Sequence, residues 1–130
     1  RWDNTATVLE ELAASARDAG LEPVFALIPA PFQIDPAVML QYARGFGLDT
    51  ARIDADQPNR LLGAAMAARG LQTIDVLPAF RDAHRAGASL YGTVDQHFTA
   101  AGHALFTEQI LPSVLERLRP TTDARRATKR

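Results

Sequence analysis

The seven residues 23–29, Pro-Val-Phe-Ala-Leu-Ile-Pro, restrict the fold more than any other stretch of the chain. They are apolar without interruption, but they are far too few to span a bilayer. A short apolar run between prolines is typical of a strand buried on both faces, as in a parallel sheet covered by helices. Residues 73–77, Thr-Ile-Asp-Val-Leu, alternate in polarity and predict a second strand, and residues 50–54 predict a short extended segment.

Helical patterns separate and follow these runs. Their caps, prolines and glycines predict helices from Asp3 or Asn4 to Gly20, from Pro36 to Phe46, from Gln57 to Gly70, from Pro78 to Ala86 and from Thr99 onward. We expect the buried side of the first helix to hold Val8, Leu9, Leu12 and Ala16, and the last helix to bury one stripe of Phe106, Ile110, Val114 and Leu118.

Strands that alternate with helices predict an α/β fold, with a mostly parallel sheet between helix layers in a three-layer arrangement. The 130 residues suit one compact domain, which we expect to cover residues 1–119. Residues 120–130 carry four basic side chains and one acidic one, with no apolar residue larger than alanine, and are expected to form a flexible basic tail.

Composition excludes several classes of protein. The formal net charge is −1, so no overall field attracts the chain to nucleic acid or to an acidic membrane. No cysteine is present, which excludes disulfides and thiolate metal sites, and no segment of this chain is long and apolar enough to cross a membrane. The chain begins Arg1-Trp2 and has its two methionines inside, so we expect it to be part of a longer protein.

The residues with the clearest chemical potential are Asp95 and His97, in a loop just before the last helix. In open α/β sheets, ligands gather at the loops that leave the carboxyl ends of the strands, and this loop follows the second predicted strand and its helix. A histidine that acts as a general base needs an acceptor for its second ring nitrogen, and an aspartate two residues away can supply one. The same aspartate can equally satisfy amides of its own loop.

Residues 95–103, Asp-Gln-His-Phe-Thr-Ala-Ala-Gly-His, resemble the last sequence block of the SGNH, or GDSL-type, serine hydrolases. The single residue between Asp95 and His97 looks more like the branch related to alginate-type O-acetyltransferases, although Phe98 stands where that branch usually has tryptophan. The resemblance implies a flavodoxin-like fold, an acyl ester substrate, with a carbohydrate as one candidate carrier of the ester, and no cofactor. In it, His97 is the general base and acid, and Asp95 orients it.

The resemblance leaves the nucleophile unassigned. A Gly-Asp-Ser run is absent, Ser15 and Ser113 lie within predicted helices, and the loop around Ser89 has no strained elbow. The resemblance therefore implies that this chain is the C-terminal part of an esterase or O-acyltransferase, that the serine lies in an upstream segment acting as its partner, and that the chain alone is inactive.

Three other interpretations stay open at this point. One is a non-catalytic SGNH-like module that binds carbohydrate or serves as a scaffold. A second is a divalent metal site formed by Asp95, His97 and His103, and a third is a nucleic-acid arm in the basic tail. The apolar run 23–29 also predicts an open strand edge, which favours oligomerisation or poor solubility of the isolated chain.

Overall fold

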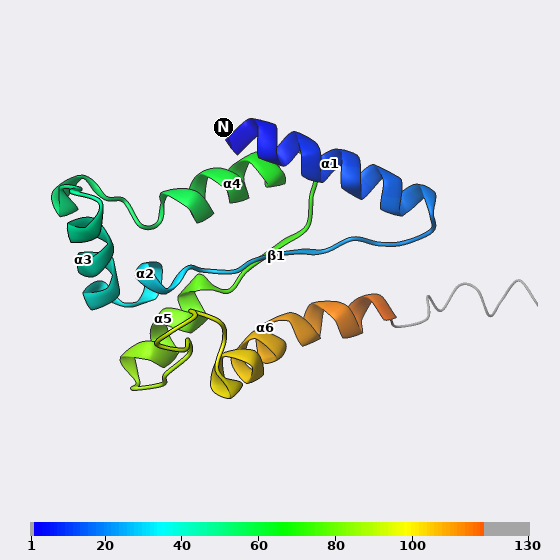
Figure 1. The fold of residues 1–130 in the computed structure, drawn as a ribbon. Helices are drawn as coiled ribbons and strands as arrows, with labels where there is room; N and C mark the ends of the chain where they lie inside the picture. Colours follow the sequence, from blue (N-terminus) through cyan, green and yellow to red (C-terminus); the bar gives the residue numbers. More distant parts are fainter. Residues whose placement is uncertain (1, 119–130) are drawn as a thin grey trace, which may run out of the picture.

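The computed structural model describes residues 2–118, and helices dominate it (Figure 1). In chain order the elements are α1 (Trp2–Asp18), β1 (Phe25–Leu27), α2 (Pro31–Ile34), α3 (Pro36–Gly45), the 3₁₀ helix η1 (Thr50–Arg52), α4 (Gln57–Ala67), β2 (Thr73–Asp75), α5 (Leu77–Arg85) and α6 (Ala100–Leu118). The basic tail predicted at 120–130 lies outside the described residues.

The prediction of a three-layer, flavodoxin-like α/β fold is wrong, because helices make up most of the described chain. Its sheet consists of β1 and β2 alone, three residues each, which pair in parallel with Phe25 opposite Thr73 and Leu27 opposite Asp75. A sheet this small does not form the central layer that the apolar runs predicted.

Local hydrogen bonds explain why so little strand forms. The segment 50–54, predicted as extended, contains η1 instead, because the Asp49 carboxylate accepts the amide hydrogen of Ala51 and starts a helical turn. In the same way the Asp75 carboxylate accepts the amide hydrogen of Leu77 at 3.0 Å. That bond ends β2 and begins α5, so the predicted strand 73–77 loses Val76 to the cap position of the helix and Leu77 to the helix itself.

Helices pack on both sides of the strand pair (Figure 1). On one side α1 lies against α4, over a buried cluster of Ala6, Ala13, Met66 and Leu71 with Phe25 and Leu27 beside it. On the other side α5 and α6 enclose Ile34, Val76, Leu77, Phe80 and Leu90, with Ile74 beside them. Side chains of successive strand residues point to opposite faces, so the two strands feed two separate clusters.

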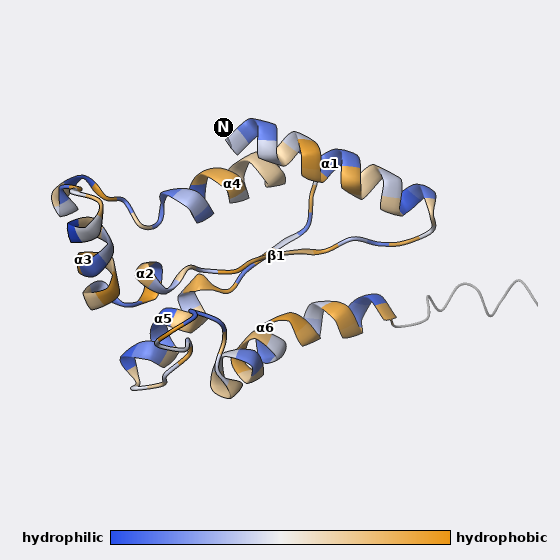
Figure 2. Ribbon diagram, viewed as in Figure 1, coloured by the Kyte–Doolittle hydropathy of each residue, from blue (hydrophilic) through white to orange (hydrophobic). Residues whose placement is uncertain are grey.

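The predicted buried faces of the two outer helices are partly wrong. In α1 the buried positions are Ala6 and Ala13, whereas Val8 and Leu12 are more than half exposed. In α6 the predicted stripe is half-buried at Phe106 and Ile110 but exposed at Val114 and Leu118. Figure 2 shows apolar colour along the part of α6 that extends beyond α5. The spacing was helical in both cases, but none of the elements within residues 2–118 covers these positions.

Candidate functional site

Asp95 and His97 lie in a compact turn that the chain closes just before α6. The amide of Gly92 donates to the carbonyl of His97 at 2.8 Å, and the amide of Thr99 donates to the carbonyl of Leu90 at 3.0 Å. At the turn, Gln96 adopts a positive φ of 57°, a conformation that non-glycine residues seldom take. The residues 92–97 are therefore held in one tight loop by their own backbone.

Within this loop the aspartate contacts the histidine twice. Asp95 Oδ2 lies 3.1 Å from His97 Nδ1, within hydrogen-bond reach, and Asp95 Oδ1 accepts the His97 amide hydrogen at 3.2 Å. The hydrogen bond from the His97 amide contributes most, and the one from the His97 imidazole contributes next. Together they hold the pKa of the Asp95 carboxyl below its usual value. The geometry is equally that of an aspartate satisfying its own loop, and no observation tests the catalytic roles predicted for Asp95 and His97.

The pair stands out in solvent and not in a cleft. The side chains of His97 and Asp95 are 84% and 63% exposed. The nearby cleft of about 590 Å³ lies between α3 and residues 87–96, and neither Asp95 nor His97 lines it. Groups that shift pKa strongly for catalysis are usually desolvated, and this pair is not.

The cleft itself is lined by residues from α3, from α5 and from the loop after α5, and of those named here only Ser89 was considered as a catalytic residue from the sequence. Tyr42 comes from α3, His84 from α5, and Ser89 and Tyr91 from the loop that follows. The Tyr42 hydroxyl donates to Gln96 Oε1 at 2.7 Å and so ties α3 to the Asp95 loop. Tyr42 and Gln96 are 54 residues apart in the sequence, and no local pattern predicts that they are in contact.

Three aromatic rings continue from the cleft across the surface of α2 and α3. Phe32 lies 5.5 Å from Tyr42 between ring centroids, and Tyr42 lies 6.2 Å from Phe46. Phe46, at the C-terminal end of α3, is 73% exposed. We call Phe32, Tyr42 and Phe46 the aromatic row. A large exposed aromatic next to a cleft is typical of a surface that binds another protein.

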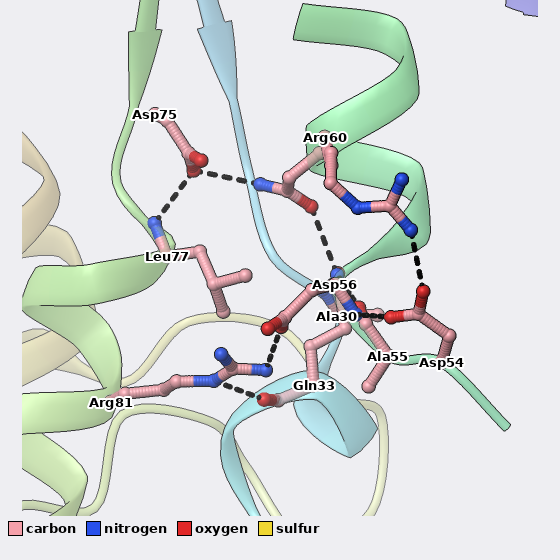
Figure 3. Close-up of polar contacts among 10 residues, drawn as sticks. Ala30, Gln33, Asp54, Ala55, Asp56, Arg60, Asp75, Leu77 and Arg81 are labelled. Atoms are coloured by element: carbon pink, nitrogen blue, oxygen red, sulfur yellow. Dashed lines mark hydrogen bonds and ion pairs between the residues drawn. The ribbon is translucent and has the colours of Figure 1, made fainter.

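A polar network joins the carboxyl ends of β1 and β2 (Figure 3). The buried Gln33 accepts the Ala30 amide at 2.8 Å and donates to the Ala55 carbonyl at 2.8 Å and to Asn59 Oδ1 at 2.9 Å. Asn59 in turn donates to the Asp75 carboxylate at 2.7 Å. Sequence reasoning placed a site at these strand ends, but every polar group named here has a partner, so the network fastens α2, α4 and β2 together.

Charged side chains beside this network are paired one to one. Arg81 donates to the Gln33 carbonyl at 2.8 Å and contacts the Asp56 carboxylate at 2.5 Å (Figure 3). Arg60 contacts Asp54 at 2.6 Å, and the bond from Arg60 holds the pKa of the Asp54 carboxyl below its usual value. Because Arg60 and Arg81 each have a carboxylate partner, this part of the described surface offers no concentrated positive charge to an anionic ligand.

The metal site considered for Asp95, His97 and His103 does not form. Across residues 2–118, no three His, Cys, Asp or Glu side chains gather where they could hold a metal ion. The His103 ring meets Phe98 edge-on instead, with 5.4 Å between centroids. In the same described part of the chain, no helix has both the length and the apolar character needed to cross a membrane.

Comparison with known proteins relates the chain to a cell division protein. The chain is similar to the cell division protein FtsQ from two strains of Caulobacter vibrioides, NA1000 / CB15N and ATCC 19089 / CIP 103742 / CB 15. Each alignment is 39% identical over 82 residues, which is 63% of this chain and 24% of the relative. The chain thus matches about a quarter of the length of these relatives. No protein-family model and no solved structure matches the chain.

This relationship overturns the hydrolase interpretation. The matching proteins are named for cell division, no SGNH or GDSL family model matches, and the fold is mostly helical. The prediction of an esterase or acyltransferase is therefore wrong. So are the predictions that depend on it: the acyl or carbohydrate ester substrate, the upstream partner segment bearing the serine, and the related carbohydrate-binding module. The Asp-x-His pattern alone does not establish an enzyme, because a tight turn and a catalytic dyad place the same two residue types side by side.

Proposed function

We propose that this chain supplies a protein-binding surface that acts in cell division. The observation that carries the proposal is the 39% identity over 82 residues to a cell division protein. The alignment covers 63% of the chain, so it includes most of the folded part and is not confined to one helix.

The surface that best fits this role is the aromatic row together with the adjoining cleft. Phe46 exposes most of its ring to solvent, and Leu48 beside it is also more than half exposed. Aromatic side chains are enriched in protein interfaces, because one ring buries a large area at a small cost in conformational entropy. Paired charges elsewhere on the chain favour apolar recognition over electrostatic recognition.

The row is also held in place before a partner arrives. Tyr42 is fixed by its bond to Gln96 and by its contacts with Phe32 and Phe46. A preorganised surface loses little freedom on binding, which increases the affinity obtained from the same area. Phe46 at the end of the row is the residue expected to contribute most of the binding free energy.

The test is the position of the chain in dividing cells. A fluorescent fusion of the whole chain, expressed in Caulobacter vibrioides, is expected to concentrate at the division plane. Uniform fluorescence throughout the cell cycle would contradict the proposal.

Two matched variants locate the surface. Phe46→Asp is expected to reduce the midcell signal several-fold, because a carboxylate replaces the apolar anchor. Leu21→Asp makes the same chemical change at another exposed position and is expected to leave the signal unchanged. Circular dichroism of both purified variants checks that they stay folded. Equal loss of signal in both variants would show that the aromatic row is not the binding surface.

A further inference from the structure

The cleft between α3 and residues 87–96 contains a carboxylate with one unused oxygen. Asp35 stands at the start of α3, where its Oδ1 accepts the amide hydrogen of Ala37 at 2.7 Å and caps the helix. Its Oδ2 accepts no hydrogen bond within residues 2–118 and lies 3.9 Å from His84 Nε2, which is beyond hydrogen-bond distance. The Asp35 and His84 side chains are only 30% and 32% exposed. The cleft wall therefore presents a half-buried acceptor to which no described residue donates.

Other carboxylates near the strand ends are paired with an arginine of this chain, in the pairs Asp54–Arg60, Asp56–Arg81 and Asp82–Arg85. Asp35 has no such partner: the described residues that line the cleft include no lysine, no arginine and no other aspartate or glutamate. Because the Asp35 side chain is partly shielded from water, it attracts a cation more strongly than a fully exposed carboxylate does. The charge of the cleft is therefore complementary to a cation supplied from outside the described chain.

The neutral groups of the cleft suit a guanidinium better than an ammonium. The side chains of Gln41, Ser89 and Thr93 line the cleft, and none of them makes a hydrogen bond with another described residue. Tyr42 adds an aromatic ring to the same lining. A guanidinium has five N–H donors in one plane and stacks on aromatic rings, whereas an ammonium has three donors and a compact shape. An arginine side chain can therefore bond to Asp35 and to neutral oxygens of the cleft at the same time.

We propose that the cleft receives an arginine side chain of a partner protein, whose guanidinium donates to Asp35 Oδ2. The inference rests on the proposed protein-binding role of the aromatic row and states which chemistry the partner presents. Tyr42 belongs to both the aromatic row and the cleft lining, so one partner segment that covers Phe46 also reaches the cleft. The cleft of about 590 Å³ is within the size range of sites that enclose a small ligand, and it accommodates one side chain.

Arginine is also the cationic residue that protein interfaces favour. It is enriched in interfaces and among the residues that contribute most to binding, whereas lysine is depleted. A guanidinium is more weakly hydrated than an ammonium, so it loses less when it leaves water. A partner segment that placed a carboxylate here would be repelled by Asp35. Phe46 and Asp35 thus form an apolar anchor and a charged anchor of one binding surface.

The first experiment titrates the complete 130-residue chain with side-chain analogues and follows the backbone amides by NMR. n-Propylguanidinium, which represents arginine, is expected at millimolar concentrations to shift the amides of Gln41, Ser89 and Gly92 until they saturate. Butyramide, an uncharged probe of similar size, is expected to leave them unshifted, and n-butylammonium, which represents lysine, is expected to bind several-fold more weakly. No shift with n-propylguanidinium, equal shifts with butyramide, or equal binding of n-butylammonium would overturn the proposal.

A matched pair of variants tests the carboxylate without removing a helix cap. Asp35→Asn removes the charge but keeps an oxygen for the Ala37 amide, since asparagine caps a helix as well as aspartate does. It is expected to weaken the binding of n-propylguanidinium roughly tenfold or more. Asp49→Asn makes the same change at the cap of η1, outside the cleft, and is expected to leave binding unchanged. Equal affinity of Asp35→Asn and the wild type would contradict the proposal.

Two variants of His84 separate the effect of charge from that of shape. His84→Arg places a permanent cation of the chain beside Asp35 and is expected to weaken the binding of n-propylguanidinium roughly tenfold or more. His84→Gln keeps a neutral side chain at this position and is expected to bind the probe as the wild type does. Circular dichroism checks that all four variants stay folded. Equal losses in the two His84 variants would mean that the cleft responds to shape and not to charge, which disproves the inference.

The fluorescent fusion in dividing cells distinguishes a partner's arginine from a free cation. Asp35→Asn is expected to lower the midcell signal several-fold, and Asp49→Asn is expected to leave it unchanged. A full midcell signal in Asp35→Asn would show that no partner arginine occupies the cleft, while the cell-division role would stand. Uniform fluorescence of the wild type would contradict the cell-division role and with it the partner, whatever the titrations show.

Discussion

The two sides of the strand pair are built from side chains of different size. The α5–α6 side buries Phe80, Val76, Leu77 and Leu90, and Phe80 lies 5.2 Å from the Phe98 ring. The α1–α4 side buries two alanines, with Met66 and Leu71 as its larger members. Small side chains let helices approach closely but remove little apolar surface from water. The comparison teaches that stability is concentrated on the α5–α6 side.

The largest test of this difference is truncation on each side. Phe80→Ala is expected to lower the free energy of unfolding by roughly 4 kcal/mol, and Met66→Ala by roughly 3 kcal/mol, since each leaves a cavity. Both side chains are fully buried, so exposure does not explain the difference. Urea denaturation monitored by circular dichroism measures both. A larger loss for Met66→Ala would reverse the comparison.

The two sides of the strand pair also differ in how closely a helix packs against the neighbouring chain at its glycine. A Cβ atom added at Gly102 in α6 would lie 2.2 Å from the Leu90 carbonyl oxygen, so Gly102→Ala is expected to cost roughly 3 kcal/mol. At Gly63 in α4 the nearest atom is Leu27 Cδ1 at 3.8 Å. Gly63→Ala is expected to stabilise the protein by about 0.5 kcal/mol, because alanine loses less entropy in a helix. Thermal melts of the two variants are expected to shift in opposite directions.

Hydrogen bonds and ion pairs on the two sides of the strand pair are expected to differ less in their effect on stability. Tyr91 donates to the Pro29 carbonyl and so fastens the loop before α6 to the end of β1. Tyr91→Phe is expected to cost about 1 kcal/mol through the lost hydrogen bond. On the α1–α4 side, Arg69 contacts Asp3 and Glu10 at 3.3 and 3.4 Å, and Arg69→Met is expected to cost less than about 1 kcal/mol because both carboxylates are largely exposed.

Tyr91 also predicts a dependence on pH. Burial raises the pKa of Tyr91 to about 12, above its ordinary value of 10.0. Between these values the folded state keeps a proton that the unfolded state releases, so the stabilisation present below pH 10 is lost as pH rises toward 12. The urea midpoints of the wild type and Tyr91→Phe are expected to differ by a constant amount below pH 10. The difference is expected to shrink as the pH rises above 10. Parallel profiles would show that Tyr91 is not buried as described.

The smallest expected effect concerns the Asp95 loop. The carboxyl of Asp95 is expected to titrate below its ordinary pKa, because the amide and imidazole of His97 bond to the charged form. Any stabilisation from these bonds is present above the ordinary pKa and lost as pH falls through the lowered one. In His97→Ala the pKa is expected to rise only part of the way, since the backbone bond is retained. NMR titration of the Asp95 side-chain carbon measures both, and an unchanged pKa in His97→Ala would mean that the imidazole does not bond to Asp95.

Signals that act within a few residues were readable in advance. Asp35 caps α3 by accepting the Ala37 amide, as the Asp-Pro step predicts, and Gly20 and Gly70 take the positive φ expected at helix ends. The distance between Asp95 and His97 was also predictable, because two residues in one turn have few ways to lie apart. The function of that pair was not, since the same local geometry serves a loop and an enzyme.

The sequence by itself determined roughly where the five longer helices start and stop, because caps, prolines and glycines act through bonds to their own neighbours; it missed the short α2 and η1. Only the tertiary structure decided which apolar residues are covered. Val8 and Leu12 follow helical spacing as well as Leu9 does, yet they are exposed, because burial requires a second element on that side and none of the described elements lies there. Three further features depend on segments that are far apart in the chain. They are the cleft beside Tyr42, the lack of space for a side chain at Gly102, and the open edge of β1. Their positions follow from packing, which no local pattern encodes.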